Sequence, residues 1–287
     1  MKISKAFDAY KKVMIMKGYS RRVIEHHDYV KKRIVKKIGD KELKDLTLDD
    51  IFKWRETMKT RKLPDGKVVE RASNSIRCDM QRLKALIKYM YITGEECINY
   101  QLIPVPKSDC VERCFLYEHE VQAMIDNAFS LRNKFIISLL YSSGIRLSEL
   151  LSLNRDSIVN RTFTVIGKGK KMRICFIDER TEQLMSEYLN SRKDSCSALV
   201  VSELYKSRMT PTNVQLLIRN SAKRAGIEKP VTPHILRHSF ATNFLRAGGN
   251  IRYLSHMLGH SSMNTTLIYT HVVNNELYDQ YCAFHTV

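Results

Sequence analysis

Apolar residues recur with helical spacing through the first hundred residues of the chain. The segment 73–93 places five of them on one helical face before Gly94 ends the pattern: Ile76, Met80, Leu83, Ile87 and Met90. Two earlier helices are expected at 3–16 and 20–37, and the capping-box spacing of Thr47 and Asp50 opens another. Because no strand-like alternation precedes residue 100, this half is predicted to be a small helical bundle.

The pattern changes in the second half, where helices are expected first at 118–129 and 132–143. Residues 161–177 carry β-branched and aromatic side chains on both sides of a Gly-Lys-Gly turn, which indicates a hairpin, and a third short strand is expected at 198–202. Helices then return at 212–225, 233–247, 250–258, 264–271 and about 275–284. The predicted fold class is mainly α, with a small antiparallel three-stranded sheet in the second half.

The length of 287 residues exceeds the usual size of one domain, so two domains are expected. The segment "IPVPKSDCVERCF", residues 103–115, carries two prolines that disfavour helix and is typical of a linker. We therefore expect a helical domain at 1–103, a linker at 104–114 and a second domain at 115–287.

The chain is strongly basic, with a formal net charge of +18. Residues 1–104 contain 25 basic and 14 acidic side chains, a balance of +11, which leaves +7 for the rest. Such an excess favours a polyanionic partner, and nucleic acid comes first because its phosphates form a dense linear array. Solvated lysine faces are the alternative explanation. A membrane surface is disfavoured because no apolar run approaches the roughly 20 residues that span a bilayer.

Metal ligands and targeting segments are not indicated by the sequence. The lysine-rich N-terminus lacks the apolar core of a signal peptide. Seven cysteines include no CxxC pair, and Cys110 and Cys114 have no second pair to complete a zinc site. His234 and His238 are four residues apart, but no third ligand lies near them in sequence. Reduced thiols and a cytoplasmic location are expected.

Four short stretches of the second half carry candidate chemistry. "SSGIRLSELLSL" contains Arg146, "GKGKK" contains Lys168, "TPHILRHSFAT" contains His234 and Arg237, and "LGHSSMNTTLIYTH" contains His260 and Tyr269. Each residue also has an ordinary explanation: a surface arginine, a solubilised turn, an ion pair, or a tyrosine that packs in the core. Taken one at a time, they leave the function open.

Taken in this order and at these separations, the four stretches closely resemble the tyrosine recombinase (phage integrase) family, of the Xer-like or mobile-element integrase type. The resemblance runs from residue 115 to the end of the chain, whereas the first half resembles the family's SAM-like core-binding domain only in size and character. Asn250 and Ser255 depart from the acid and glutamine frequent in the family, and "MRICFI" lacks its usual proline. The resemblance implies six active-site positions: Arg146, Lys168, His234, Arg237, His260 and Tyr269.

The chemistry of these residue types suits DNA strand transfer. A covalent enzyme–phosphate bond conserves the energy of a broken phosphodiester, and tyrosine is one side chain that can form it. Two arginines present planar donor forks to the phosphate, and His260 adds a hydrogen bond. His234 is the candidate base and Lys168 the candidate acid for the departing 5′ oxygen. No metal, ATP or other cofactor is expected, since the arginines supply the positive charge.

The resemblance further implies a site-specific recombinase that forms a transient 3′-phosphotyrosine bond during integration, excision or dimer resolution. Its partners would be DNA with inverted-repeat sites and other copies of the chain, joined into a tetramer by the C-terminal helix near 275–284. An accessory protein or a second recombinase stays open as a further partner. Two alternative functions also stay open: a type IB topoisomerase-like relaxation of DNA and a catalytically idle DNA-binding protein.

Overall fold

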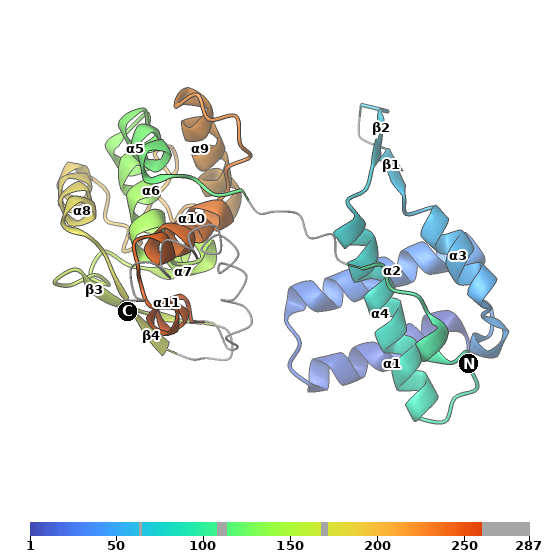
Figure 1. Cartoon of the computed structure of the whole chain (residues 1–287). Helices are drawn as coiled ribbons and strands as arrows, with labels where there is room; N and C mark the ends of the chain where they lie inside the picture. Colours follow the sequence, from blue (N-terminus) through green and yellow to red (C-terminus); the bar gives the residue numbers. More distant parts are fainter. Residues whose placement is uncertain (63–64, 108–113, 168–171, 260–287) are drawn as a thin grey trace, which may run out of the picture. The chain divides into compact units, whose positions relative to one another are not determined.

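A computed structural model of the chain describes residues 1–62, 65–107, 114–167 and 172–259 (Figure 1). The chain divides into two compact units, residues 1–112 and 113–287, and each has its own hydrophobic core. The division falls within the segment expected to be a linker.

The first unit is built on helices close to those that the apolar pattern predicts. The predicted capping box is present: the Thr47 hydroxyl accepts from the backbone N–H of Asp50, and the Asp50 carboxylate accepts from that of Thr47. Helix α4 buries Met80, Leu83 and other residues of its predicted face against α1 and α2. The helices are α1 (Ile3–Met16), α2 (Arg21–Ile38), α3 (Leu48–Glu56) and α4 (Ser73–Ile92), with short 3-10 turns at Leu43–Asp45 and Tyr100–Leu102.

The expectation that no strand precedes residue 100 is wrong. Strands β1 (Thr60–Lys62) and β2 (Val68–Glu70) form an antiparallel hairpin between α3 and α4. Each strand has three residues, and Val68 is exposed, so no buried face imposes the period of two that identifies longer strands. The local signal was in the turn, where the Asp65 carboxylate accepts from the backbone N–H of Lys67.

The second unit packs its helices around α6, whose residues from Phe135 to Leu140 are all buried. Helix α6 contacts α5, α8 and α10, as Figure 1 shows for the green and orange helices. The elements are α5 (Glu118–Asp126), α6 (Leu131–Ser143), α7 (Leu147–Ser152), β3 (Thr162–Ile166), β4 (Met172–Phe176), α8 (Glu179–Ser191), α9 (Pro211–Arg224), α10 (Pro233–Arg246) and α11 (Ile251–Leu258).

The predicted hairpin is present as β3 and β4, which pair antiparallel with Thr164 opposite Ile174. Phe163, Val165, Arg173 and Cys175 point inward, and the residues between them are exposed. Within the described part of the chain this sheet has two strands. The segment 198–202, expected as a third strand, does not pair with β3 or β4. Its backbone instead makes two isolated bridges, Ala198 to Asn154 and Val201 to Arg208.

Helix α8 is the other element that the apolar pattern left unassigned. Asp178 caps it by accepting from the backbone N–H of Thr181 at 2.7 Å, and Thr181 and Tyr188 are buried. The helices expected at 264–271 and 275–284 lie outside the described residues. Among the helices that the structure does describe, none is both long and apolar enough to cross a membrane.

Candidate active site

The end of α6 and the end of α11 are joined by one side chain, that of Arg237. This arginine lies on α10 with 6% of its surface exposed. Its two terminal nitrogens donate to the carbonyl oxygens of Gly144 at 2.6 Å and Leu258 at 2.7 Å. Residues far apart in sequence are therefore held at fixed positions around one guanidinium.

Arg146 follows two residues after Gly144 and is the N-cap of α7. Its backbone N–H donates to Glu149 Oε2 at 2.7 Å, and its Nη1 donates to Glu149 Oε1 at 2.8 Å. The side chain stays 30% exposed, so the guanidinium reaches solvent while Glu149 holds one edge of it. Arg146 therefore lies in the turn after α6, and Arg237 reaches the same turn from α10 through the carbonyl oxygen of Gly144.

Glu149 is buried and shared by two arginines. Arg173, on the inward face of β4, donates Nη1 to Oε1 at 2.8 Å and Nη2 to Oε2 at 2.6 Å of this carboxylate. Burial alone would raise the pKa of Glu149, but the hydrogen bonds from Arg173 and Arg146 lower it to about 2. The carboxylate is therefore ionised at neutral pH, and its two arginine partners leave one net positive charge on this group of three side chains.

His234 lies in the first turn of α10, after the N-cap Thr232 and Pro233 at the first helical position. The side chain is exposed, and His234 lies three positions before Arg237 along the helix. Lys168 belongs to the segment between β3 and β4, His260 follows Gly259 at the end of α11, and Tyr269 comes later. All three lie outside the described residues.

Two residues of this cluster were not singled out in the sequence, Glu149 and Arg173. Glu149 carried a local signal, because an acid three residues after an N-cap is typical of a capping box. Arg173 carried only a weak one, a charged residue at an inward position of a predicted strand. Its partner is 24 residues away in the chain, so the pair could not be recognised from local spacing.

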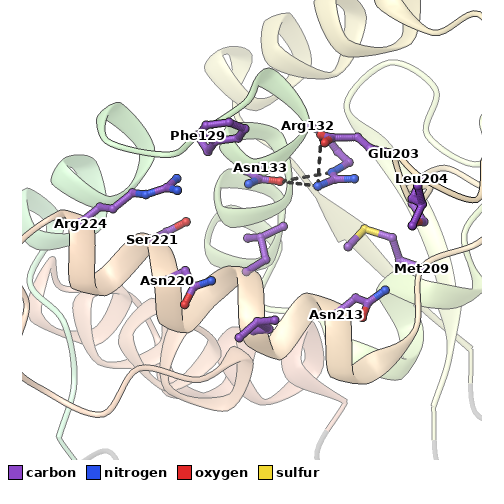
Figure 2. A pocket seen from close by; sticks show the side chains of 13 residues that line it. Phe129, Arg132, Asn133, Glu203, Leu204, Met209, Asn213, Asn220, Ser221 and Arg224 are labelled. Carbon is purple, nitrogen blue, oxygen red and sulfur yellow. Dashed lines mark hydrogen bonds and ion pairs between the residues drawn. The ribbon is translucent and has the colours of Figure 1, made fainter.

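One hollow of the second unit, away from this cluster, is less suited to phosphate chemistry. The hollow of about 340 Å³ lies between the start of α6 and α9, but Figure 2 shows its Arg132 turned toward Asn133 and Glu203. Exposed apolar side chains, Phe129 and Leu204, form part of the lining. In the described ranges no three His, Cys, Asp or Glu side chains gather as metal ligands would.

Comparison with known proteins matches the second half of the chain to a family. The model of the phage integrase family matches residues 114–276. Tyrosine recombinase XerD of Oceanobacillus iheyensis is 34% identical over 64% of this chain and 66% of that protein. Tyrosine recombinase XerA of Pyrococcus horikoshii is 36% identical over 71% of each chain. Tyrosine recombinase XerD of Rickettsia bellii is 28% identical over 91% of this chain and 88% of its own.

Solved structures give the same result for the fold. A crystal structure of XerA recombinase aligns over 99% of this chain and 98% of that chain, with 27% identity and a TM-score of 0.55. A Tn1549 transposon integrase, solved in complex with transposon right end DNA, aligns over 99% of each chain with 19% identity and a TM-score of 0.79. With the family match, these likenesses establish that the chain belongs to the phage integrase family.

Proposed function

We propose that this protein is a site-specific DNA recombinase that cuts and rejoins strands through a transient bond between Tyr269 and a 3′ phosphate. The observation that carries the proposal is the pair of arginines, Arg146 and Arg237, anchored on one turn of the second unit. A diester phosphate held between two such forks is polarised toward attack. The tyrosine recombinase names of the relatives support the same activity.

In each step of the proposed reaction, one bond to phosphorus forms while another breaks. The Tyr269 hydroxyl attacks phosphorus and gives its proton toward His234, while the bond from phosphorus to the 5′ oxygen breaks. Lys168 protonates that oxygen as it leaves, and Arg146, Arg237 and His260 hold the non-bridging oxygens. Rejoining runs the same steps in reverse with another 5′ hydroxyl. The arginines supply the positive charge, so the proposal requires neither a divalent metal nor ATP.

The first unit is proposed to be the core-binding domain, which would hold the DNA together with the second unit. Both halves are basic, with balances of +11 and +7, which suits one polyanion contacted by both. A partner of this kind also explains a tether between two compact units. Solved relatives in the fold comparison include a lambda integrase dimer bound to a core site and XerH bound to a palindromic substrate.

Assembly is proposed to depend on the end of the chain. Leu277, Tyr278, Tyr281 and Phe284 have helical spacing, and we propose that this segment docks on a neighbouring copy in a tetramer that holds two DNA duplexes. Inverted-repeat sites would match such an assembly. An accessory protein or a second recombinase could join it, and with DNA as substrate the protein would act in the cytoplasm.

An SDS-resistant protein–DNA adduct tests the proposed function directly. DNA flanking the gene, nicked to trap the intermediate, is incubated with protein in EDTA and without ATP. Wild type and Tyr253→Phe, which alters an exposed tyrosine of α11, should form the adduct, and Tyr269→Phe should not. An adduct that survives Tyr269→Phe would refute the nucleophile. Relaxation of supercoiled DNA at any sequence would instead indicate a topoisomerase, and DNA binding with no adduct an idle binding protein.

A further inference from the structure

Arg173 connects three segments that the proposed function brings to one phosphate. Its guanidinium forms a two-pronged pair with Glu149, at 2.8 and 2.6 Å, and Glu149 in turn holds Arg146. Its Nε donates to the carbonyl oxygen of Met257 at 2.8 Å. The next carbonyl along α11, that of Leu258, is the one that Arg237 binds. Two arginines therefore hold consecutive carbonyls at the end of α11.

The packing around Arg173 leaves little freedom at that point. Gly259 ends α11 with a positive φ of 63°, and a Cβ there would lie 2.8 Å from Arg173 Cδ. Only a glycine lets the chain pass this close before it continues to His260. Arg173 is also the second residue of β4, and β4 follows directly on the segment that contains Lys168. The position of Arg173 is thus coupled to the start of β4, next to the segment with Lys168, and to the end of α11, next to His260.

Charge gives Arg173 a second effect on the site. Glu149 is buried, and with Arg146 as its sole partner the carboxylate would cancel the charge that Arg146 offers to a phosphate. Arg173 matches both carboxylate oxygens, so the three side chains together keep one net positive charge. The guanidinium of Arg146 can then act on DNA as a cation and not as one half of a neutral pair.

We propose that Arg173 is a positioning residue for strand cleavage: through Glu149 it keeps the fork and the charge of Arg146 available to the scissile phosphate. This inference rests on the proposed function. The simpler explanation is a buried ion pair that only stabilises the fold. Arg192 provides a matched control for this explanation. Its side chain is only 3% exposed, forms a two-pronged pair with Asp194 and donates to the carbonyl oxygens of Ala198 and Leu199.

The test uses full-length protein and two nicked DNA substrates, one with an ordinary scissile phosphate and one with a methylphosphonate. The methyl group replaces a charged oxygen, so cleavage of the second substrate depends less on Arg146. Arg173→Lys should slow single-turnover adduct formation about 100-fold on the phosphate, the order expected for a displaced catalytic group. On the methylphosphonate, the rate of adduct formation by Arg173→Lys should be within about tenfold of the wild-type rate. Arg146→Ala should show the same narrowing of the difference from wild type. Arg192→Lys should show the same change on both substrates.

The outcomes separate this inference from the proposed function. An equal defect of Arg173→Lys on both substrates, or one no larger than that of Arg192→Lys, would reduce Arg173 to a structural ion pair. Wild type that forms no adduct on either substrate would remove the proposed function, and this inference with it. DNA affinity and thermal unfolding are measured for each variant. If Arg173→Lys does not fold, Arg173→Gln, which keeps a donor for Glu149, is tested by the same comparison.

Discussion

The carbonyl oxygen of Gly144 accepts a hydrogen bond from Arg237 Nη1 at 2.6 Å across 93 residues of sequence. Gly144 ends α6 in the left-handed region, with a φ of 59°, and turns the chain directly into Arg146. This hydrogen bond therefore sets the distance between the turn that carries Arg146 and helix α10, which carries Arg237.

Gly144→Ala should destabilise the second unit by about 2–4 kcal/mol. The positive φ costs an alanine roughly 1 kcal/mol, and its Cβ would lie 2.5 Å from the ring of Phe240, which adds a packing strain of about 1–3 kcal/mol. Gly226→Ala is the control, because φ is 71° there and nothing lies within 4 Å of the added Cβ. Urea unfolding followed by circular dichroism measures both, and equal losses would contradict the packing contribution.

Arg237→Lys should lower the rate of adduct formation by about 10²–10³-fold, the usual effect of removing a preorganised donor at a reacting oxygen. Lysine keeps the charge but cannot donate to the carbonyl oxygens of Gly144 and Leu258 at once. Arg208→Lys is the control, since Arg208 likewise donates to two carbonyl oxygens, of Leu151 and Leu153. Single-turnover assays at saturating DNA should leave this control within a few-fold of wild type.

The pH dependence of stability should report the Glu149 carboxylate. Its pKa is lowered from 4.5 to about 2, so it contributes stability that is fully present above pH 4.5 and is lost as pH falls toward 2. The shift corresponds to about 3 kcal/mol. The difference in unfolding free energy between wild type and Glu149→Gln should therefore shrink as pH falls from 6 to 3.

Glu203→Gln serves as the control for this pH series. Its carboxylate pairs with Arg132 at 3.2 Å but is more than half exposed, and a surface pair of this kind contributes about 0–1 kcal/mol. A small offset from wild type is expected throughout. If Glu149→Gln instead kept a constant offset down to pH 3, the carboxylate would not be ionised through its arginine pairs.

Local patterns predicted the helices well because each needs only spacing and caps. Met80 and Leu83 mark the buried face of α4, and Thr47 with Asp50 starts α3. The short hairpin of β1 and β2 was not predicted, because three-residue strands have no periodic face. Helix α8 was not predicted either, although Asp178 is a residue type that caps helices. Arg146 and Arg237 were named through a family resemblance, and no local rule relates them.

The contacts of the site itself depend on long-range pairing. Arg173 contacts Glu149, 24 residues away in the chain, and Met257, 84 residues away. The local sequence "KMRICF" predicts neither partner. A buried arginine becomes understandable only when the carboxylate that it neutralises is known. The family resemblance therefore supplied the candidate site residues, whereas the residues that hold them became apparent only from the structure.

The last prediction concerns the first unit, where a buried carboxylate joins three basic side chains. Asp79 on α4 contacts His26 Nε2 at 2.8 Å, Arg33 Nη1 at 3.0 Å and Arg71 Nη1 at 3.1 Å. These contacts tie α2 and the end of the β1–β2 hairpin to α4. Asp79→Asn removes the charge and leaves two arginines without it, which should cost about 3–5 kcal/mol.

Trp54 makes this loss measurable in the first unit alone, because it is the single tryptophan of the chain and is fully buried there. The fluorescence transition during urea unfolding should move to lower denaturant in Asp79→Asn. Circular dichroism reports the helices of both units, and its component that the fluorescence lacks, from the second unit, should stay in place. Asp8→Asn, at an exposed pair with Lys31, should change either transition by less than about 1 kcal/mol. A shift of both transitions in Asp79→Asn would mean that the two units do not unfold independently.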